Sequence, residues 1–550
     1  MAGLRPARLR QANLEVTPQK PSGGPADNPL AAAARLLGEG RLEDAARLCL
    51  GVVKEAPETI AAWSLLGNVR VTQKRYADAI HCYGRVLAVA PEASEVHSNL
   101  GAVHQLLGES KRAAECFRRA IALKPDYVQA HCNLGVSLRK LGRLDEAIAC
   151  QHRAIEIAPE YAKARYNLGN ALKQACEVSA AIDAYRRAKA FDPGHAETRN
   201  NLATVLESQG HTAKALGEFA RAMEMDESYV EAHYNYALLH RFEAGDPLPD
   251  KLRLLDRLEG QSAVNRNRLA FALAKVNAYL GDYDGAFALY TEANATRRQG
   301  SNYDKSAAAR EVDVIISRNA ARRDGAAPVE TGSAPVPIFV LGLSRSGKTL
   351  IETLLAAQAG TFAAGESEHW QRLRRAMAKS GPDDAAPARL GEEYRKEMRR
   401  LAGPAKFFVS TLDSNILWLA EIAAALPEAR FILCRREALD NALLIYLKRY
   451  EQGHAHAYDF DDIAHFMAQR ARLQVHWRGL YGERIMTVEY EALMRGGGAV
   501  AAAIAAHSGL EYDRRAAPPE FHEDEIGIWK CYEKHIQPLR AALARQRRYK

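Results

Sequence analysis

The N-terminal half of the chain repeats one pattern of small, aromatic and proline residues at intervals of 34 positions. The alanine positions are Ala45, Ala79, Ala113, Ala147, Ala181 and Ala215. The other small positions are Gly67, Gly101, Gly135, Gly169, Ala203 and Ala237, and the prolines are Pro57, Pro91, Pro125, Pro159 and Pro193. The ring positions are Tyr83, Phe117, Tyr185 and Phe219, with Gln151 as the exception. Small residues let two helices cross closely, a ring fills the gap to the next unit, and proline ends the second helix. The pattern predicts stacked helix pairs, an all-α solenoid, over residues 28–241.

The segments around this repeat differ from it in pattern. Residues 1–27 precede it and are expected to form a disordered tail. Residues 242–321 remain helical in pattern, and Leu269–Asn294 is expected to be one more helix pair with a turn at Gly281-Asp282, outside the 34-residue register. Residues 322–336 are rich in proline, glycine and alanine, which is typical of a linker.

Beyond the linker, residues 337–550 alternate between short apolar runs and helical patterns. The strands are expected to end at Leu341 and to lie at Phe407–Val409 and Arg430–Leu433, with helices up to about Ala357, at Asn415–Leu426 and from Asp440. This alternation predicts an α/β domain with a parallel sheet. A fragment from about residue 335 to 550 is expected to fold by itself.

The segment PIFVLGLSRSGKTLIE, residues 337–352, carries the clearest chemical signal of this second half. An apolar strand ends at Gly342, and a helical pattern begins after Lys348 and Thr349. Glycines let backbone amides approach an anion, and the helix N-terminus adds partial positive charge. Gly342 is followed after four residues by Gly347-Lys348-Thr349, which also satisfies the Walker A spacing. The loop is therefore expected to bind either a nucleoside triphosphate or another phospho-anion donor.

Composition and charge narrow the class of protein. With 550 residues, 47% hydrophobic and 26% charged, the chain is typical of a globular protein with more than one domain. The net charge of +8 is mild and does not argue for nucleic-acid binding. The eight cysteines are scattered without metal-ligand spacing, which favours buried thiols in a reducing compartment and no metal site. The N-terminus has no signal-peptide core, and no apolar run reaches 18 residues, so a cytoplasmic location without a transmembrane segment is expected.

The 34-residue pattern resembles the tetratricopeptide repeat. The resemblance implies that first-helix residues such as Asn133, Asn167 and Asn201 face a concave surface and contact a peptide or protein partner. The alternative is that these asparagines bond to the neighbouring unit. The array could equally recruit a partner or form a homo-oligomer.

Four segments of the second half resemble the sulfotransferase family, whose donor is 3′-phosphoadenosine-5′-phosphosulfate. The loop fits the family pattern G-x-P-R-S-G-T-T-L, with Ser344 in place of proline and Lys348 in place of the first threonine. The resemblance implies that the loop residues bind the 5′-phosphosulfate, and these are Arg345, Ser346, Gly347, Lys348 and Thr349. Arg345 and Lys348 would also act catalytically by offsetting charge on the bridging oxygen as the sulfuryl group leaves.

The other three segments concern the nucleotide. Arg436 takes the place of the arginine that holds the 3′-phosphate in the pattern R-[DN]-P-x-D-x-x-x-S, but Leu444 replaces the serine. Tyr490, in a V-x-Y-E strand motif, is expected to line the nucleotide pocket or to be a buried structural tyrosine. Residues 527–539 resemble the family's C-terminal G-x-W-x-x-Y-E segment, while the stretch before them, 516–525, is short. The family's D-K-x-P-x-N survives only as STLDSN at 410–415.

A base must remove the proton of the acceptor hydroxyl. The resemblance places it at Glu366, in a Gly-Glu pair after the loop helix, with Glu368 and His369 as alternates. The competing interpretation is that Glu366 caps a helix or pairs with a cation.

Three hypotheses follow for the second half. The leading one is a sulfotransferase acting on a hydroxyl or phenol, such as a protein tyrosine, with glycan and lipid acceptors left open. The second is a P-loop kinase or NTPase, for which Asp413 is the nearest candidate to hold Mg²⁺. The third is a degenerate domain on a repeat scaffold.

Overall fold

A computed structural model describes residues 28–243, 245–320, 335–377, 386–451, 453–516 and 526–547. The tail expected at 1–27 and nearly all of the linker expected at 322–336 lie outside these residues. The chain divides into two compact units, Met1–Ala232 and His233–Lys550. Among the described residues, no helix has both the length and the apolar composition needed to cross a membrane.

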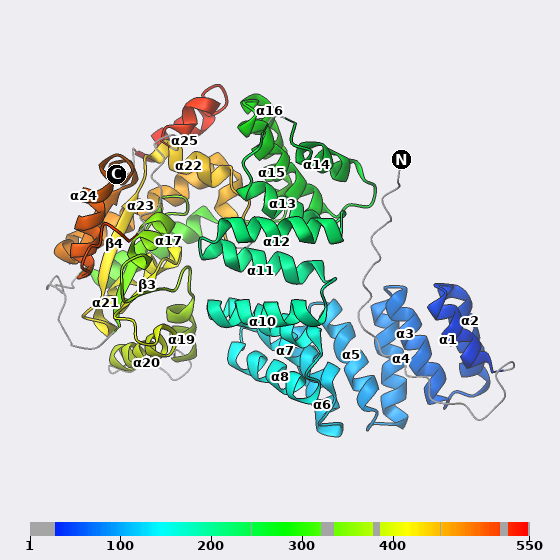
Figure 1. Cartoon of the computed structure of the whole chain (residues 1–550). Coiled ribbons are helices and arrows are strands. Elements are labelled where there is room, and N and C mark those ends of the chain that lie inside the picture. Colours follow the sequence, from blue (N-terminus) through cyan, green and yellow to red (C-terminus); the bar gives the residue numbers. More distant parts are fainter. Residues whose placement is uncertain are drawn as a thin grey trace. The chain divides into compact units, whose positions relative to one another are not determined.

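The first unit consists of antiparallel helix pairs, as the repeat pattern predicts (Figure 1). Its helices are α1 Pro29–Gly38, α2 Leu42–Glu55, α3 Ile60–Thr72, α4 Tyr76–Val89, α5 Ser94–Leu106, α6 Ser110–Leu123, α7 Val128–Lys140, α8 Leu144–Ile157, α9 Ala162–Gln174, α10 Val178–Phe191, α11 Ala196–Ser208 and α12 Thr212–Met225. Helix α13, Val230–Leu239, crosses the boundary between the units.

The repeating glycines and rings explain how the pairs close. A Cβ atom added at Gly67 would lie 2.5 Å from Cε1 of Tyr83, so the ring of α4 rests directly on the glycine of α3. Tyr83 also belongs to a buried cluster with Val96 and Val103 of α5. The ring therefore fills the gap to the next pair, as expected, and also packs against the other helix of its own pair. At the exceptional position, Gln151 is buried and donates a hydrogen bond from Nε2 to the carbonyl of Cys132, 2.8 Å away.

The second unit begins with helices and continues into the sheet. The helices before the sheet are α14 Leu248–Arg257, α15 Ala263–Tyr279, α16 Tyr283–Gln299 and α17 Lys305–Asn319. The helix pair expected within Leu269–Asn294 is confirmed as α15 and α16. Gly281 has a φ of 85° in the turn, and Asp282 caps α16 by accepting a hydrogen bond from the amide of Gly285 at 2.9 Å.

Within the described part of the chain, the sheet has five strands, all parallel, in the order β2-β3-β1-β4-β5, which confirms the α/β prediction. The strands are β1 Val336–Leu341, β2 Thr361–Ala363, β3 Phe407–Ser410, β4 Arg430–Arg435 and β5 Ile485–Glu489. The helices are α18 Lys348–Ala356, α19 His369–Met377, α20 Ala386–Ala402, α21 Leu419–Ala425, α22 Ala438–Tyr446, α23 Phe460–Tyr481, α24 Tyr490–Ser508 and α25 Gln537–Arg547. Short 3-10 turns lie at Asp413–Trp418, Ala455–Tyr458, Gly482–Arg484 and Ile528–Tyr532.

Helices cover both faces of this sheet because alternate strand residues point to opposite sides. Ile338 and Val340 of β1 belong to one buried cluster, which α18 and α24 complete. Phe339 and Leu341 belong to the other, which contains Trp370 and Trp477. The site of interest lies at the carboxyl ends of the strands, where the connecting loops gather.

Helix α17, upstream of the expected linker, is part of this second core. Val312 is buried in the same cluster as Phe339, and Ile315 and Ile316 pack against that cluster. Asn294 of α16 donates a buried hydrogen bond of 2.9 Å to the carbonyl of Tyr446 at the end of α22. The helices before the linker therefore stabilise the α/β region.

These contacts lead to a prediction about fragments. A fragment of residues 233–550 should unfold at a higher temperature than a fragment of 335–550, because the shorter one exposes the apolar surface that α17 covers. The measurement is thermal unfolding of both fragments by circular dichroism. Val312→Asp in the longer fragment removes the apolar contact of α17 and should lower the unfolding temperature as well. Equal unfolding temperatures would support an independently folding 335–550 domain instead.

Candidate functional site

The loop between β1 and α18 has the backbone that a phosphate-binding loop requires. Gly342, Arg345 and Gly347 all have positive φ, at 148°, 65° and 100°. A Cβ at Gly342 would lie 2.6 Å from the carbonyl oxygen of Cys434, and one at Gly347 would lie 2.5 Å from Cδ2 of Tyr490. The two glycines are required because the loop passes directly against β4 and the start of α24.

Neighbouring elements hold this loop in place. Asn441 of α22 donates to the carbonyl of Ser344 at 2.8 Å, and the hydroxyl of Tyr450 donates to Ser344 Oγ at 2.9 Å. The thiol of Cys434 donates to the carbonyl of Ser346 at 2.8 Å. Within the described part of the chain, the buried hydroxyl of Ser346 has no hydrogen-bond partner. A buried polar atom without a partner is costly, so this hydroxyl fits a site that a polar ligand completes.

Lys348 is the only cation of the loop that the structure buries, with 5% of its surface exposed. Its ammonium donates to the carbonyl of Thr411 at 2.7 Å and pairs with the carboxylate of Asp413. Burial lowers the pKa of Lys348 to about 8, while the negative charge of Glu366 opposes that shift. Arg345 and Thr349, by contrast, are exposed. The sequence did not indicate that Asp413 reaches Lys348, because the contact joins two loops that are far apart in the chain.

Glu352 is a site residue that the sequence did not single out. It lies one helical turn after Lys348, and its carboxylate accepts from the amide of Gly365 at 2.7 Å and from the hydroxyl of Thr411 at 3.3 Å. Burial raises the pKa of Glu352. These hydrogen bonds fix the turn that carries Glu366 against α18.

The three candidate bases lie in different surroundings. Glu366 is exposed, and its charge acts on both Lys348 and Tyr450, which places it beside the loop. Glu368 forms an exposed ion pair of 3.0 Å with Arg375. His369 is buried and contacts Ser367 and Glu397, the latter at 3.3 Å. Glu366 is therefore the candidate whose charge reaches the loop lysine, and its role as base stays a prediction.

A cavity of about 550 Å³ adjoins the loop at Leu343 and Ser346. Its lining includes Ser346, both arginines of the β4 end, Asn441 and the apolar residues Ala464 and Met467 of α23. The guanidinium of Arg436 stacks over the ring of Tyr490 at 4.1 Å, and Arg435 pairs with Glu489 at 3.3 Å. Tyr490 is buried, and its ring packs against the guanidinium of Arg436. Tyr490 therefore contacts both the phosphate loop, at Gly347, and Arg436 in the cavity wall.

The C-terminal segment is tied to the same region. Asp440 of α22 accepts hydrogen bonds from the amides of Gly527 and Trp529, at 2.6 and 3.0 Å. Leu543 and Gln546 of α25 complete the cavity wall. The short stretch expected at 516–525 lies, apart from residue 516, outside the described residues.

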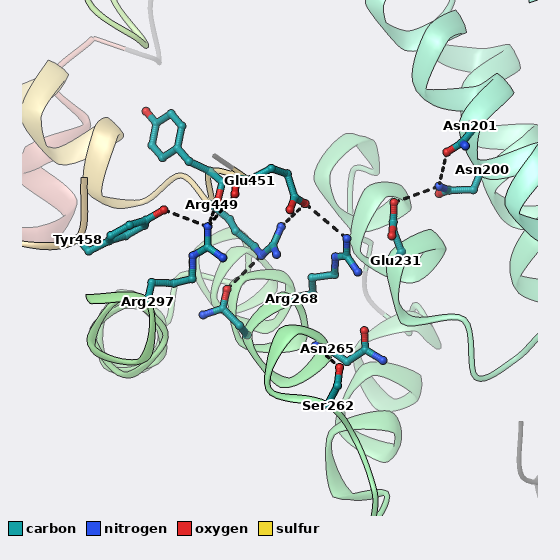
Figure 2. Close-up of polar contacts among 12 residues, drawn as sticks. Asn200, Asn201, Glu231, Ser262, Asn265, Arg268, Arg297, Arg449, Glu451 and Tyr458 are labelled. Atoms are coloured by element: carbon teal, nitrogen blue, oxygen red, sulfur yellow. Dashed lines mark hydrogen bonds and ion pairs between the residues drawn. The ribbon is translucent and has the colours of Figure 1, made fainter. Parts of the chain in front are cut away.

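Side chains of the upstream helices α15 and α16 hold the segment that carries Tyr450 (Figure 2). Arg297 of α16 donates to the carbonyl of Tyr450 and, at 3.1 Å, to the hydroxyl of Tyr458. Arg449 pairs with Glu451 and donates to Asn267 of α15 at 3.0 Å. Helices α15 and α16 therefore position the tyrosine that bonds to the phosphate loop.

The first unit has a polar cavity of its own, of about 620 Å³, lined by residues of α7, α9, α11 and α13. Asn201 lines it and donates to Asn170 at 2.9 Å and to the hydroxyl of Tyr166 at 3.2 Å. Asn167 is buried and donates to the sulfur of Cys132 in the preceding pair at 3.1 Å. Within the asparagine series, Asn167 thus bonds to the neighbouring unit, whereas Asn201 also faces the cavity.

Comparison with known families agrees with this architecture. Residues 30–80, 58–126 and 126–193 match the tetratricopeptide repeat, and residues 337–514 match the sulfotransferase family. The chain therefore carries tetratricopeptide repeats followed by a domain of the sulfotransferase family. A domain of this family implies a donor of the phosphoadenosine phosphosulfate type.

Individual relatives are distant. An uncharacterized protein of Aquifex aeolicus (strain VF5) is 23% identical over 333 residues, which cover 53% of this chain and 43% of that protein. The chain thus spans less than half the length of this relative. The crystal structure of YrrB, described as a tetratricopeptide protein with an unusual peptide-binding site, is 20% identical and matches 34% of this chain and 98% of its own, with a TM-score of 0.29. A tetratricopeptide protein of Parabacteroides merdae ATCC 43184 is 13% identical over 44% of this chain and 97% of its own, with a TM-score of 0.38.

The loop geometry predicts the effect of a single methyl group. Gly347→Ala should lower the free energy of unfolding by about 1–3 kcal/mol, because the added Cβ meets Tyr490 and the φ of 100° disfavours any side chain. Gly479→Ala is the matched control, since Gly479 lies within α23 with open space around its Cβ position, and it should be neutral or slightly stabilising. Urea unfolding followed by tryptophan fluorescence measures both, and equal stabilities would contradict this loop conformation.

Proposed function

We propose that this protein is a sulfotransferase that moves a sulfuryl group from 3′-phosphoadenosine-5′-phosphosulfate to a hydroxyl or phenol of a protein acceptor. The observation that carries the proposal is the phosphate loop with its buried cation Lys348 and its unsatisfied Ser346 hydroxyl, in a domain of this family. When bound, this donor supplies the sulfuryl group and a nucleotide that leaves as an anion.

The donor side uses the loop and the cavity beside it. The backbone amides of the loop, the hydroxyl of Ser346 and the ammonium of Lys348 would offset the charge of the leaving nucleotide. Arg345 would add a second cation from the exposed rim of the loop, and Thr349 a hydroxyl at the start of α18. Arg436, held on the ring of Tyr490, would meet the 3′-phosphate with its planar fork.

The acceptor side uses Glu366. Its carboxylate lies near enough to Lys348 for their charges to interact, and it is exposed enough to meet an incoming hydroxyl. Glu366 would take the proton of the acceptor as the new bond to sulfur forms. The tetratricopeptide array suits a peptide or protein acceptor, which would bind where Asn201 and its neighbours line the polar cavity.

The ion pair between Lys348 and Asp413 favours a second candidate, a P-loop kinase or NTPase. Such enzymes place an acidic residue on a neighbouring strand end to hold Mg²⁺ next to the loop lysine. Asp413 follows β3, which pairs with β1, and its carboxylate reaches the lysine. A requirement for Mg²⁺ separates this candidate from sulfuryl transfer.

The proposed roles predict different kinetic effects. Arg345→Ala should weaken donor binding and turnover more than about tenfold, whereas Glu366→Gln should lower turnover about a hundredfold and leave donor binding nearly unchanged. Sulfuryl transfer to tyrosine peptides and product-nucleotide binding measure the two effects, and both should persist in EDTA. Activity that disappears with EDTA and returns with Mg²⁺ would favour the kinase or NTPase candidate.

The replacement of the family's serine by Leu444 predicts weak recognition of the 3′-phosphate. A hydrogen bond to a charged group contributes about 1.5–3 kcal/mol, so Leu444→Ser should tighten binding of adenosine 3′,5′-bisphosphate about tenfold or more over adenosine 5′-phosphate. Arg436→Ala should abolish the preference, and Leu447→Ser, at the C-terminal end of the same helix, is the control. If the wild type binds neither nucleotide and Leu444→Ser changes nothing, the domain is better interpreted as a degenerate part of a repeat scaffold.

A further inference from the structure

Two polar side chains of the phosphate loop are in opposite states. Among the described residues, the buried hydroxyl of Ser346 has no hydrogen-bond partner, so it is open to a ligand. The ammonium of Lys348 is already engaged, because it donates to the carbonyl of Thr411 at 2.7 Å and pairs with Oδ1 of Asp413. An anionic ligand that reaches this ammonium must therefore displace Asp413 or share the ammonium with it.

Asp413 is placed to leave the ammonium without opening the core. Its side chain is 28% exposed, against 5% for Lys348, and it begins the 3-10 turn Asp413–Trp418. Its second oxygen, Oδ2, lies 3.7 Å from Nε2 of His454, which is just too long for a hydrogen bond. A small rotation of the side chain would close this gap and break the ion pair. One carboxylate therefore has two partners within its reach.

Tyr450 holds the imidazole of His454 in place. The two rings stack with their centroids 4.1 Å apart and their planes 18° apart. The hydroxyl of Tyr450 donates to Ser344 of the phosphate loop at 2.9 Å. The tyrosine that supports the loop thus also fixes His454 beside Asp413, and an imidazole N–H is a suitable donor to a carboxylate.

We infer that Asp413 competes with the anionic oxygens of the donor for Lys348, and that His454 receives Asp413 when the donor binds. The inference rests on the proposed function, since it concerns the same loop and the same donor. Glu352 and Glu366 already add negative charge around the ammonium. Moving Asp413 away removes a further negative charge from the place that an anion would occupy. Asp413 thereby sets the affinity of the loop, and His454 is a positioning residue that acts through Asp413.

The first test compares anion binding by two carboxylate variants of the full chain. Burial lowers the pKa of Lys348 to about 8, so calorimetry with adenosine 3′,5′-bisphosphate in EDTA is done at about pH 6.5, where the ammonium is charged. Asp413→Asn should bind the bisphosphate about tenfold more tightly than the wild type, because the competing charge is gone. An unchanged or weaker affinity would overturn the inference. A purely structural role of Asp413 would lower the unfolding temperature of this variant without raising its affinity.

Glu421→Gln is the matched control for the loss of one carboxylate. Glu421 is about as exposed as Asp413 and forms its own ion pair with Arg374 at 3.1 Å. This variant should change the affinity for the bisphosphate by less than about twofold. A gain as large as that of Asp413→Asn would mean that any lost negative charge strengthens binding, which would overturn a specific role of Asp413.

His454 provides a second test that leaves the ion pair intact. His454→Phe keeps a ring against Tyr450 but removes the donor, so the bisphosphate should bind about threefold to tenfold more weakly, whereas His454→Gln keeps a donor and most of the affinity. In the Asp413→Asn background, His454→Phe should have no further effect. Equal affinities of the two His454 variants, or an equal loss in both backgrounds, would overturn the inference. If circular dichroism shows that Asp413→Asn is unfolded, the comparison of His454→Phe with His454→Gln decides alone.

Sulfuryl transfer is measured separately, so the two proposals fail in different ways. Tighter binding by Asp413→Asn without any transfer by the wild type would contradict the proposed function and support the competition. Transfer by the wild type, with no gain in binding by Asp413→Asn, would do the reverse. Binding of MgATP that Asp413→Asn abolishes would contradict both, because Asp413 would then hold Mg²⁺. No binding of the bisphosphate by either chain would also overturn both.

Discussion

The buried ammonium of Lys348 is the interaction on which the second unit's site depends. A cation with 5% exposure is tolerated only where carboxylates and carbonyls compensate its lost hydration, and Asp413 and the Thr411 carbonyl do so here. Glu352 and Glu366 add negative charge from the helix and the next loop. The result is a buried ion pair at the edge of the sheet, next to a helix N-terminus whose backbone amides suit an anionic ligand.

The contacts that hold the phosphate loop extend well beyond the loop itself. Asn441 and Tyr450 hold Ser344, and Arg297 of α16 holds the backbone of Tyr450 in turn. Two successive contacts, from Arg297 to Tyr450 and from Tyr450 to Ser344, therefore connect a helix that precedes the expected linker to the loop. The helices after the repeats thus contribute to the geometry of the site, in addition to connecting the repeats to it.

The local features could be predicted from the sequence, whereas the contacts between distant segments could not. The helix pairs and the parallel sheet follow from the periodicity of apolar residues. The glycines of the loop follow from the backbone conformation that a phosphate-binding loop needs. The helix expected from Asn415 instead begins with a 3-10 turn at Asp413–Trp418, and α21 starts only at Leu419. The contact of Asp413 with Lys348, the hydrogen bonds of Glu352 and the place of Val312 in the second core depend on how distant segments meet. No local pattern marks such contacts, so they could not be derived from the sequence.

The central claim is that the phosphate loop around Lys348 binds a phosphosulfate nucleotide without a metal ion. Titration calorimetry of the wild-type chain with 3′-phosphoadenosine-5′-phosphosulfate in EDTA, and separately with ATP in Mg²⁺, tests it most directly. The account predicts saturable one-to-one binding of the phosphosulfate nucleotide and much weaker binding of MgATP. Saturable binding of MgATP alone, with no heat from the phosphosulfate nucleotide, would contradict it.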